Sequence, residues 1–330
     1  MDTDKVAEQP WRAELRRVFL RGLRPGGPGW VEACAAVAAS MEELGCVVVA
    51  HGALDGELRR DLFGRAMPEL FALPLAVKQE TLSGSHIGGY IGPDPVKAPS
   101  LESLRISEAT DAGKLHAFSP ISFGPMETLP SVVILLLAKV IHVCSEAIEA
   151  FAKGMLELDH AVQKMVLESL GVRKEHVDSH LASLVYDVRL SRYGTLPAAA
   201  TMTKRRTWLR IGTAAWDGAW ISVAPEPGTF AVIAGDMLTV VTNGRVPACI
   251  HRVRTPSNHE RLSVLFGSSL KHGAVVSALE ELVDHGRHPL RFRPCDFDDY
   301  VKFRFGQQRP GLNSALQEFC GIVPSPPSEC

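Results

Sequence analysis

A histidine and an Arg-x-Ser sequence lie close together in the stretch CIHRVRTPSNHERLSVLFGS, residues 249–268. His251 precedes Arg261 by ten residues, and Ser263 follows two residues after the arginine. An imidazole is a common ligand for transition metals, and a guanidinium binds a carboxylate through two parallel hydrogen bonds. Because alternate residues of a strand share one face, the Ser263 hydroxyl is expected to point the same way as Arg261. This pattern alone is compatible with a metal ligand beside an anion clamp, or with a structural histidine and a surface arginine.

Composition and charge limit the classes of partner. The chain has 330 residues, 46% of them hydrophobic, and 35 Lys+Arg against 37 Asp+Glu give a formal net charge of -2. No overall field therefore attracts nucleic acid or an anionic membrane. The basic cluster Lys204, Arg205, Arg206 and Arg210 lacks interleaved aromatic side chains for base stacking, so we interpret it as a solvated loop. We expect a small-molecule ligand and no nucleic-acid partner; the oligomeric state cannot be predicted.

The first residues and the cysteines bear on localisation. The segment MDTDKVAEQPWRAELRR has no apolar core with a cleavage site, so a signal peptide is not expected. The cysteines are seven in number, scattered, and without a C-x-x-C pair, which indicates free thiols in a reducing compartment such as the cytoplasm. The longest apolar run, at 131–143, contains Lys139 and is shorter than the roughly 20 residues of a membrane-spanning helix. We therefore expect no membrane segment.

Hydrophobic periodicity divides the chain into a mainly helical first half and a β-rich second half. Helices are predicted at 29–44, within 56–74 and at 145–170, and the run GCVVVAHG at 45–52 predicts a buried strand. From about residue 181 the chain consists of short β-rich runs separated by turn signals, which favours an antiparallel sandwich or barrel. These runs are 181–193, 219–225, 228–236, 238–246, 249–255 and 261–268.

Several blocks of this half resemble one known family, the plant 2-oxoglutarate- and Fe(II)-dependent dioxygenases. They are DGAWISV (217–223), GTFAVIAGDMLTVVTNGRV (228–246), HRV (251–253) and ERLSVLF (260–266). ELGCVVVAHG, ELFALPLAVK, GGYIG, LESLRI, MVLESLGV and HPLRFRP are similar to blocks of its AOP-like branch. The resemblance implies an α+β fold with a double-stranded β-helix, or jelly-roll, core and a helical N-terminal region packed on it. The implied divisions are an N-terminal dioxygenase region (1–125), an insert and long core helix (126–180), a truncated jelly-roll domain (181–270) and a C-terminal extension (271–330).

The same resemblance implies the cofactors and the residues that bind them. In this family Fe(II) is held by two histidines and one carboxylate, which leave positions open for 2-oxoglutarate and oxygen. His251 matches the distal histidine ligand, while Arg261 and Ser263 match the pair that binds the far carboxylate of 2-oxoglutarate. Tyr193 matches the tyrosine that reaches this co-substrate, and Ser191 stands where many relatives have asparagine.

The family's His-x-Asp sequence, which supplies two of the three iron ligands, is missing. Residues 193–220 contain no histidine, and their one acid, Asp217, belongs to the turn before the next strand. Relatives have about 41 residues from that tyrosine to that tryptophan whereas this chain has 27, so roughly 14 residues are absent. A single imidazole is a poor iron site, and we assign no catalytic residue. The string HVD at 176–178 precedes Tyr193, and we interpret it as a solvated turn in preference to a ligand pair.

A second departure is the apolar stretch ETLPSVVILLLAKVIHV at 127–143, where relatives have a polar loop. It is either a buried helical turn or, together with the missing segment, the product of misplaced exon boundaries. Sequencing the full-length transcript distinguishes these explanations.

Three functional hypotheses remain open. The chain is a family member whose metal site is broken, so that it is inactive. Alternatively, it is a working oxygenase with a rearranged site, in which His251 acts with His180 or an acid from elsewhere. In the third, Arg261, Ser263 and Tyr193 form a binding module that holds an anionic metabolite without turnover.

Overall fold

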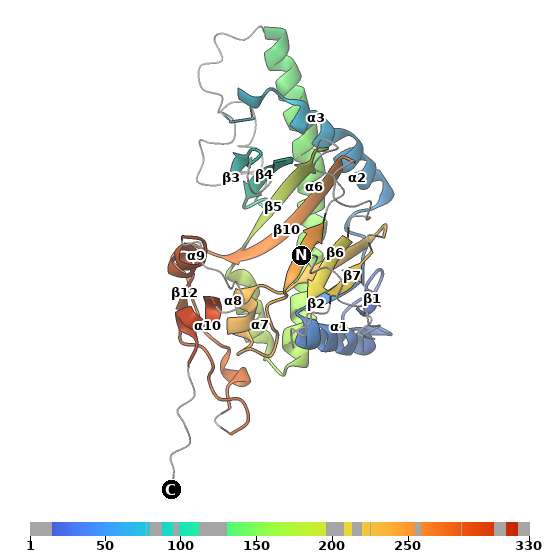
Figure 1. Ribbon diagram of the computed structural model, residues 1–330. Coiled ribbons are helices and arrows are strands. Elements are labelled where there is room, and N and C mark those ends of the chain that lie inside the picture. The colour runs from blue at the N-terminus through green and yellow to red at the C-terminus, as the bar shows by residue number, and fades with distance from the viewer. Residues whose placement is uncertain are drawn as a thin grey trace, which may run out of the picture.

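A long helix forms the spine of the molecule. The computed structural model describes residues 15–76, 78–79, 88–94, 99–111, 131–195, 208–212, 220–224, 226–254, 259–284, 286–306 and 315–322. Helix α6 (Ser131–Ser169) runs behind the sheets (Figure 1). The stripe predicted at 145–170 is buried, with Phe151 and Val162 each 1% exposed, so that prediction is confirmed. Residues 131–143 of the apolar insert are helical and form the first part of α6. Among the described helices, none is long and apolar enough to cross a membrane.

The predicted helix and strand near the N-terminus are both present and pack on the C-terminal half of α6. Helix α1 (Trp30–Leu44) ends at Gly45, whose φ of 62° requires a residue without a side chain. A Cβ at Gly45 would lie 2.1 Å from the Pro247 carbonyl oxygen. The strand β2 (Cys46–Ala50) follows, between β1 (Arg17–Phe19) and β8 (Thr229–Ile233). This three-stranded sheet therefore joins the first part of the chain to the β-rich half.

The second predicted helical stretch is continuous but changes its winding. It consists of α2 (Gly56–Asp61), a π-helical turn η1 (Leu62–Ala66) and α3 (Met67–Ala72). Asp55 caps its start by accepting hydrogen bonds from the backbone N–H groups of Glu57 and Leu58. Its buried residues share one core with α6 and with the largest sheet.

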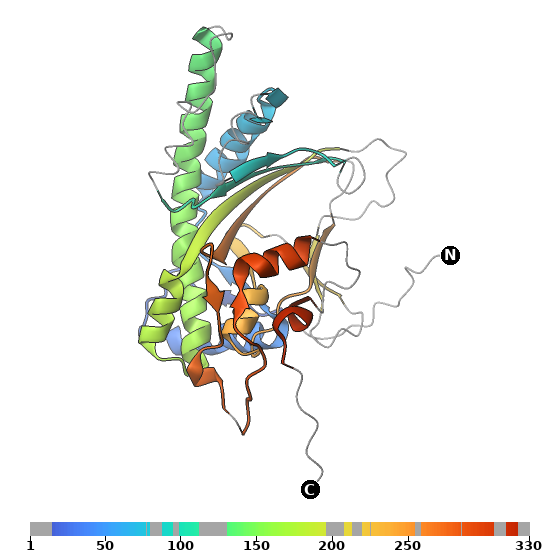
Figure 2. The same cartoon turned by 90° about the vertical axis from the view of Figure 1, so that its left-hand side faces the viewer.

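The largest sheet has four strands in the order β10-β5-β4-β3. Its curvature is clear in Figure 2, where α6 lies along the convex side. Buried Leu104, Val188 and Leu190 project from the convex side into the core shared with α6. The opposite, concave side consists mainly of polar residues. The strands are β10 (Arg261–Leu270), β5 (Leu184–Tyr193), β4 (Leu101–Ser107) and β3 (Gly88–Ile91).

The remaining elements form smaller units. A three-stranded sheet has the order β7-β6-β9. Helix α7 (Lys174–Ala182) leads from α6 into β5. The strands of the small sheet are β7 (Trp220–Val223), β6 (Trp208–Gly212) and β9 (His251–Arg254). The C-terminal part contains β11 (Val275–Val276), the 3-10 turn η5 (Glu280–Leu282), β12 (Cys295–Asp296), α9 (Phe297–Phe305) and α10 (Ala315–Cys320).

One predicted strand is wrong. The run at 238–246 was expected to be β because of its valines and threonines, but Asp236–Val241 forms helix α8 and a turn follows. Asp236 accepts a hydrogen bond from the Tyr300 hydroxyl at 2.7 Å and pairs with Arg304 at 2.6 Å. The Thr242 hydroxyl donates to the Leu238 carbonyl at 2.7 Å. Contacts with α9 and a local side-chain hydrogen bond therefore override the β propensity of this run.

Three strands lie at the ends of separate sheets. In the described part of residues 184–270 there are six strands, β5 to β10. Of these, β8, β9 and β10 each occupy an end position in the strand order of its own sheet. An end strand leaves a row of backbone N–H and C=O groups without a neighbouring strand. The β-rich half is therefore an α+β arrangement whose strands are divided among three sheets.

The packing of α6 against the curved sheet predicts a large effect of one core substitution. Phe151→Ala should lower the free energy of unfolding by about 3–5 kcal/mol, because it removes a fully buried ring between α6 and the sheet. The measurement is chemical denaturation, with Val31→Ala, at an exposed position, as the control that should change stability by less than about 0.5 kcal/mol. Equal unfolding midpoints for Phe151→Ala and the unmodified chain would contradict this packing.

Candidate functional site

The concave face of the curved sheet carries three of the residues that the sequence singled out. Residues directly opposite each other in neighbouring strands share a face, and the next residues on that face are two positions along. The antiparallel registers therefore define rows that cross β10, β5 and β4. In that order, the rows are Arg261–Tyr193–Leu101, Ser263–Ser191–Ser103 and Leu265–Arg189–Arg105.

Arg261 and Tyr193 meet in the first of these rows. The guanidinium carbon of Arg261 lies 5.1 Å from the centre of the Tyr193 ring, which is a cation–π distance. The Nη1 atom of Arg261 is buried and has no hydrogen-bond partner among the described residues. Such a buried nitrogen favours a ligand that can accept its hydrogen bonds, and a carboxylate does so best. The Ser263 hydroxyl belongs to the next row of the same face, as the sequence predicts.

A buried ion network holds this end of the sheet from the other face. The Glu102 carboxylate pairs with Arg192 at 2.6 Å and with Lys78 at 2.8 Å. Burial raises the pKa of Glu102, but hydrogen bonds from the two cations outweigh it and lower this pKa overall. Lys78 also donates to the Phe71 carbonyl at 3.0 Å, at the end of α3. The network ties β4 and β5 to the helical region directly beneath the row that contains Tyr193 and Arg261.

His251 lies on a different sheet. It starts β9 and pairs with Ile211 of β6, so both side chains occupy one face of that sheet. The His251 Nδ1 atom is 2.9 Å from the Cys249 carbonyl oxygen, which can only accept a hydrogen bond. Nδ1 therefore carries a proton and Nε2 remains available as a metal ligand. The Cys249 thiol hydrogen-bonds the imidazole and raises the pKa of His251.

The described residues around His251 do not fit Fe(II). Among the described residues, no group of three possible metal ligands includes His251. Residues 196–207 and 213–219, where Lys204, Arg205 and Arg206 lie, are outside the described residues, and they contain no histidine. Of the family's two histidines and one carboxylate, His251 is therefore the one candidate ligand among the described residues.

The prediction that His251 and Arg261 share a cavity stays a prediction. Two cavities lined by described residues have volumes of about 470 and 320 Å³, and neither is lined by either side chain.

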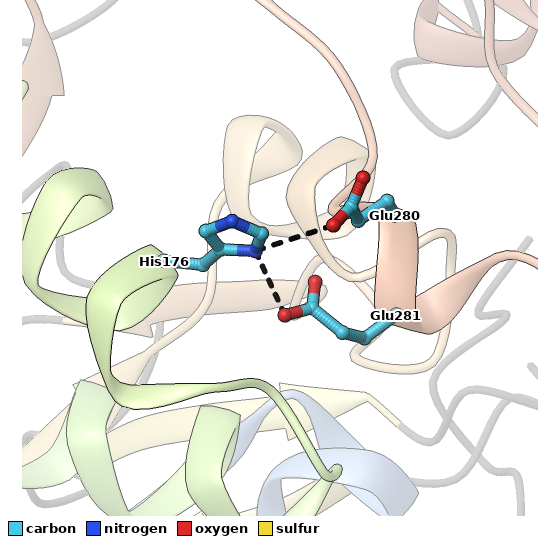
Figure 3. A group of neighbouring side chains, drawn as sticks. All are labelled: His176, Glu280 and Glu281. Carbon is cyan, nitrogen blue, oxygen red and sulfur yellow. Dashed lines mark ion pairs between the residues drawn. The ribbon is translucent and has the colours of Figure 1, made fainter.

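The HVD string forms part of helix α7 and is not a solvated turn. Figure 3 shows that His176 points toward Glu280 and Glu281 of the η5 turn. The His176 Nδ1 atom lies 2.7 Å from Glu281 and 4.0 Å from Glu280. Asp178 instead pairs with Lys164 and Lys174, so His176 and Asp178 do not act as a ligand pair.

His176, Glu280 and Glu281 are the one set of described residues whose ligand atoms all lie within 4.8 Å of one another. Arg173 already pairs with both carboxylates. Helix α7, which contains His176, leads into the end of β5 at which Leu184 pairs with Leu270. Arg261 pairs with Tyr193 at the other end of the same two strands. The cluster is an ion-pair tie between α7 and the C-terminal part, remote from the clamp.

His180, suggested as a partner of His251 in a rearranged site, faces α6 instead. Its Nε2 atom is 2.9 Å from the Gln163 side-chain oxygen. Burial lowers the pKa of His180 to about 4, so the imidazole is neutral at physiological pH. One ring nitrogen is thus committed to a hydrogen bond with α6.

Comparisons with known proteins identify the family of the chain. Residues 209–267 match the 2OG-Fe(II) oxygenase superfamily. Probable 2-oxoglutarate-dependent dioxygenase AOP1 of Arabidopsis thaliana is 30% identical over 301 residues, which cover 86% of this chain and 93% of that protein. The crystal structure of the dioxygenase for auxin oxidation in rice has a TM-score of 0.71 and 25% identity, covering 93% of this chain and 100% of that one. The structure of JOX2 in complex with 2OG, Fe and JA has a TM-score of 0.68 and 18% identity, covering 93% and 89%.

The chain belongs to the superfamily of 2-oxoglutarate- and Fe(II)-dependent oxygenases. Within it, the chain falls in the AOP-like branch of plant dioxygenases, whose cofactors are 2-oxoglutarate and Fe(II).

Sequence reasoning missed Arg189, which lies on the concave face two rows from Arg261. Its Nη2 atom donates to the Ser103 hydroxyl at 2.9 Å. Its Nε atom is buried and has no hydrogen-bond partner among the described residues. The alternation Arg189–Ser191–Tyr193 was the signal in the sequence, but the family resemblance drew attention only to the last two.

The buried environment of His180 predicts a pH-dependent stability. Because its pKa is lowered from 6.5 to about 4 on folding, the unfolded chain binds a proton below pH 6.5 that the folded chain does not. The contribution of His180 to the free energy of unfolding should therefore fall between pH 6.5 and about 4, and His180→Gln should reduce this part of the slope. An NMR titration of the His180 ring with a midpoint at or above 6.5 would show that the ring is not buried in this way.

Proposed function

We propose that this protein binds 2-oxoglutarate, or a similar dicarboxylate, without oxidative turnover. Arg261 binds the far carboxylate through both arms of its guanidinium, and Ser263 donates from the next row of the same face. The Tyr193 ring supports the guanidinium and offers its hydroxyl to the ligand. The observation that carries this proposal is the buried, unpartnered Nη1 atom of Arg261 beside that ring.

We further propose that the core is a jelly roll that lacks one β-hairpin. A jelly roll has eight strands, whereas the described part of 184–270 contains six. Two strands of about five residues with a short loop use roughly 12–14 residues, which is the length missing after Tyr193. The end positions of β8, β9 and β10 support this proposal, because an inserted pair of strands would need such edges. On this assignment 181–270 is the truncated jelly-roll domain, preceded by 1–125 and 126–180 and followed by the extension 271–330.

The missing hairpin is also the segment that would carry His-x-Asp. Fe(II) held by two histidines and a carboxylate supplies the open positions at which the keto acid and oxygen react. With His251 alone, water fills the other positions and the metal dissociates readily. The protein therefore functions as a binding protein of plant small-molecule metabolism, and we place it in the cytoplasm on the basis of its cysteines.

The proposed clamp predicts the effect of Arg261→Gln. The substitution should weaken 2-oxoglutarate binding by at least about tenfold, because a charged hydrogen bond contributes about 1.5–3 kcal/mol. Isothermal titration in the absence of metal measures this change. Arg65→Gln removes the same charge from an exposed helical position and should leave the affinity unchanged. Equal affinities of Arg261→Gln and the unmodified chain would exclude the clamp.

Restoring the hairpin tests the missing iron site. The unmodified chain should bind well under one iron per molecule and form no more succinate from 2-oxoglutarate than His251→Ala does. Inserting a hairpin of about 14 residues with His-x-Asp between Pro197 and Trp208 should raise iron binding toward one per chain, since three protein ligands are then available. The matched control carries Ala-x-Ala in the same hairpin. Succinate formation by the unmodified chain that disappears in His251→Ala would show that the site is complete by another route.

A further inference from the structure

The concave face of the curved sheet contains a second cation, Arg189, that is not balanced by an acid among the described residues. Arg189 and Arg105 lie directly opposite each other on β5 and β4. Two like charges in such positions repel each other unless each has a partner. Arg105 has one, since its Nε atom is 2.9 Å from the Asp187 carboxylate. Arg189 has no carboxylate partner among the described residues and contacts only the neutral Ser103 hydroxyl.

The position of Arg189 separates it from the proposed 2-oxoglutarate clamp. It lies four residues before Tyr193 on β5, a distance of about 14 Å along an extended strand. A five-carbon diacid held by Arg261 does not span that distance. Its Nε atom is buried and unsatisfied, which costs free energy unless an acceptor reaches it. The row of serines lies between the two arginines, so they define two anion positions on one face.

An exposed apolar side chain lies beside Arg189. Leu265 of β10 is directly opposite Arg189 in the register and is 56% exposed, although it is on the same concave face. An apolar side chain next to a guanidinium that has no carboxylate partner among the described residues matches a molecule with a hydrophobic body and one acidic group. A neutral oxygen could accept a hydrogen bond from the Nε atom, but only an anionic group also balances the charge of the guanidinium, and a cation does neither.

We propose that Arg189 binds the acidic group of a second small molecule, the substrate or former substrate of this site, and that Leu265 contacts its apolar body. This inference rests on the proposed function for the identity of the site, but Arg189 acts independently of Arg261. The ligand class is therefore a small organic acid with one carboxylate or another singly charged oxyacid group. Such a ligand occupies the face together with 2-oxoglutarate and does not compete with it.

A matched pair of probes tests this assignment. The probes are 3-phenylpropanoate and its primary amide, which share an apolar body and differ in charge; binding is measured by ligand-observed NMR without metal. The unmodified chain and Arg65→Gln should bind the acid at least tenfold more tightly than the amide. Arg189→Gln should abolish this preference, whereas Arg189→Lys should retain part of it, because the charge remains.

Titration with 2-oxoglutarate and thermal unfolding show whether each variant is folded. Arg261→Gln should retain the preference for the acid and lose 2-oxoglutarate binding. Arg189→Gln should lose the preference for the acid and retain 2-oxoglutarate binding. If the acid preference depends on Arg189 while 2-oxoglutarate fails to bind, the proposed function is wrong and this site stands. Equal binding of acid and amide, no binding of the acid, or an unchanged preference in Arg189→Gln overturns the assignment of Arg189.

Discussion

The packing of α6 against one face of the curved sheet determines where a ligand can bind. Alternate residues of β4, β5 and β10 project toward α6, and their side chains fill the apolar core. The intervening residues must then form the opposite face, which Figure 2 shows as the concave side, turned away from α6. Because α6 and the η1–α3 stretch share an apolar core with one face of these strands, the other face is free to carry arginines and serines. The ligand chemistry that we propose for this protein follows from this division of the sheet.

On the proposed function, the same scaffold explains how a ligand face can persist without a complete metal site. The rows that contain Arg261, Ser263 and Arg189 need only β4, β5, β10 and α6, all of which are complete. Iron binding in this family needs two further ligands from a His-x-Asp sequence after the tyrosine, and residues 194–220 contain no histidine. His251 remains on its strand with one ring nitrogen oriented by the Cys249 carbonyl, as for a metal ligand. On the proposed assignment, the loss is confined to the missing hairpin and the two iron ligands that it would carry.

Much of the fold could be predicted from the sequence, because long periodic stretches such as 145–170 specify an amphipathic helix by themselves. The helix at Asp236–Val241 could not, since its β-branched residues favour a strand and only contacts with Tyr300 and Arg304 decide otherwise. The clamp residues Arg261, Ser263 and Tyr193 could be identified from their spacing and from the family resemblance. Arg189 could not be identified in this way, because a sequence does not show which buried donors lack a hydrogen-bond partner. Only the three-dimensional packing shows that the Arg189 Nε atom lacks one among the described residues.

The central claim is that the co-substrate is held by protein groups alone. In a complete site of this family 2-oxoglutarate is a ligand of the metal ion, so adding metal tightens the binding of 2-oxoglutarate. The decisive measurement is the dissociation constant of 2-oxoglutarate for the unmodified chain with and without Mn(II), a redox-inert substitute for Fe(II), under anaerobic conditions. The account predicts the same value within about twofold, because a single imidazole retains little metal. A tightening of tenfold or more that disappears in His251→Ala would contradict it.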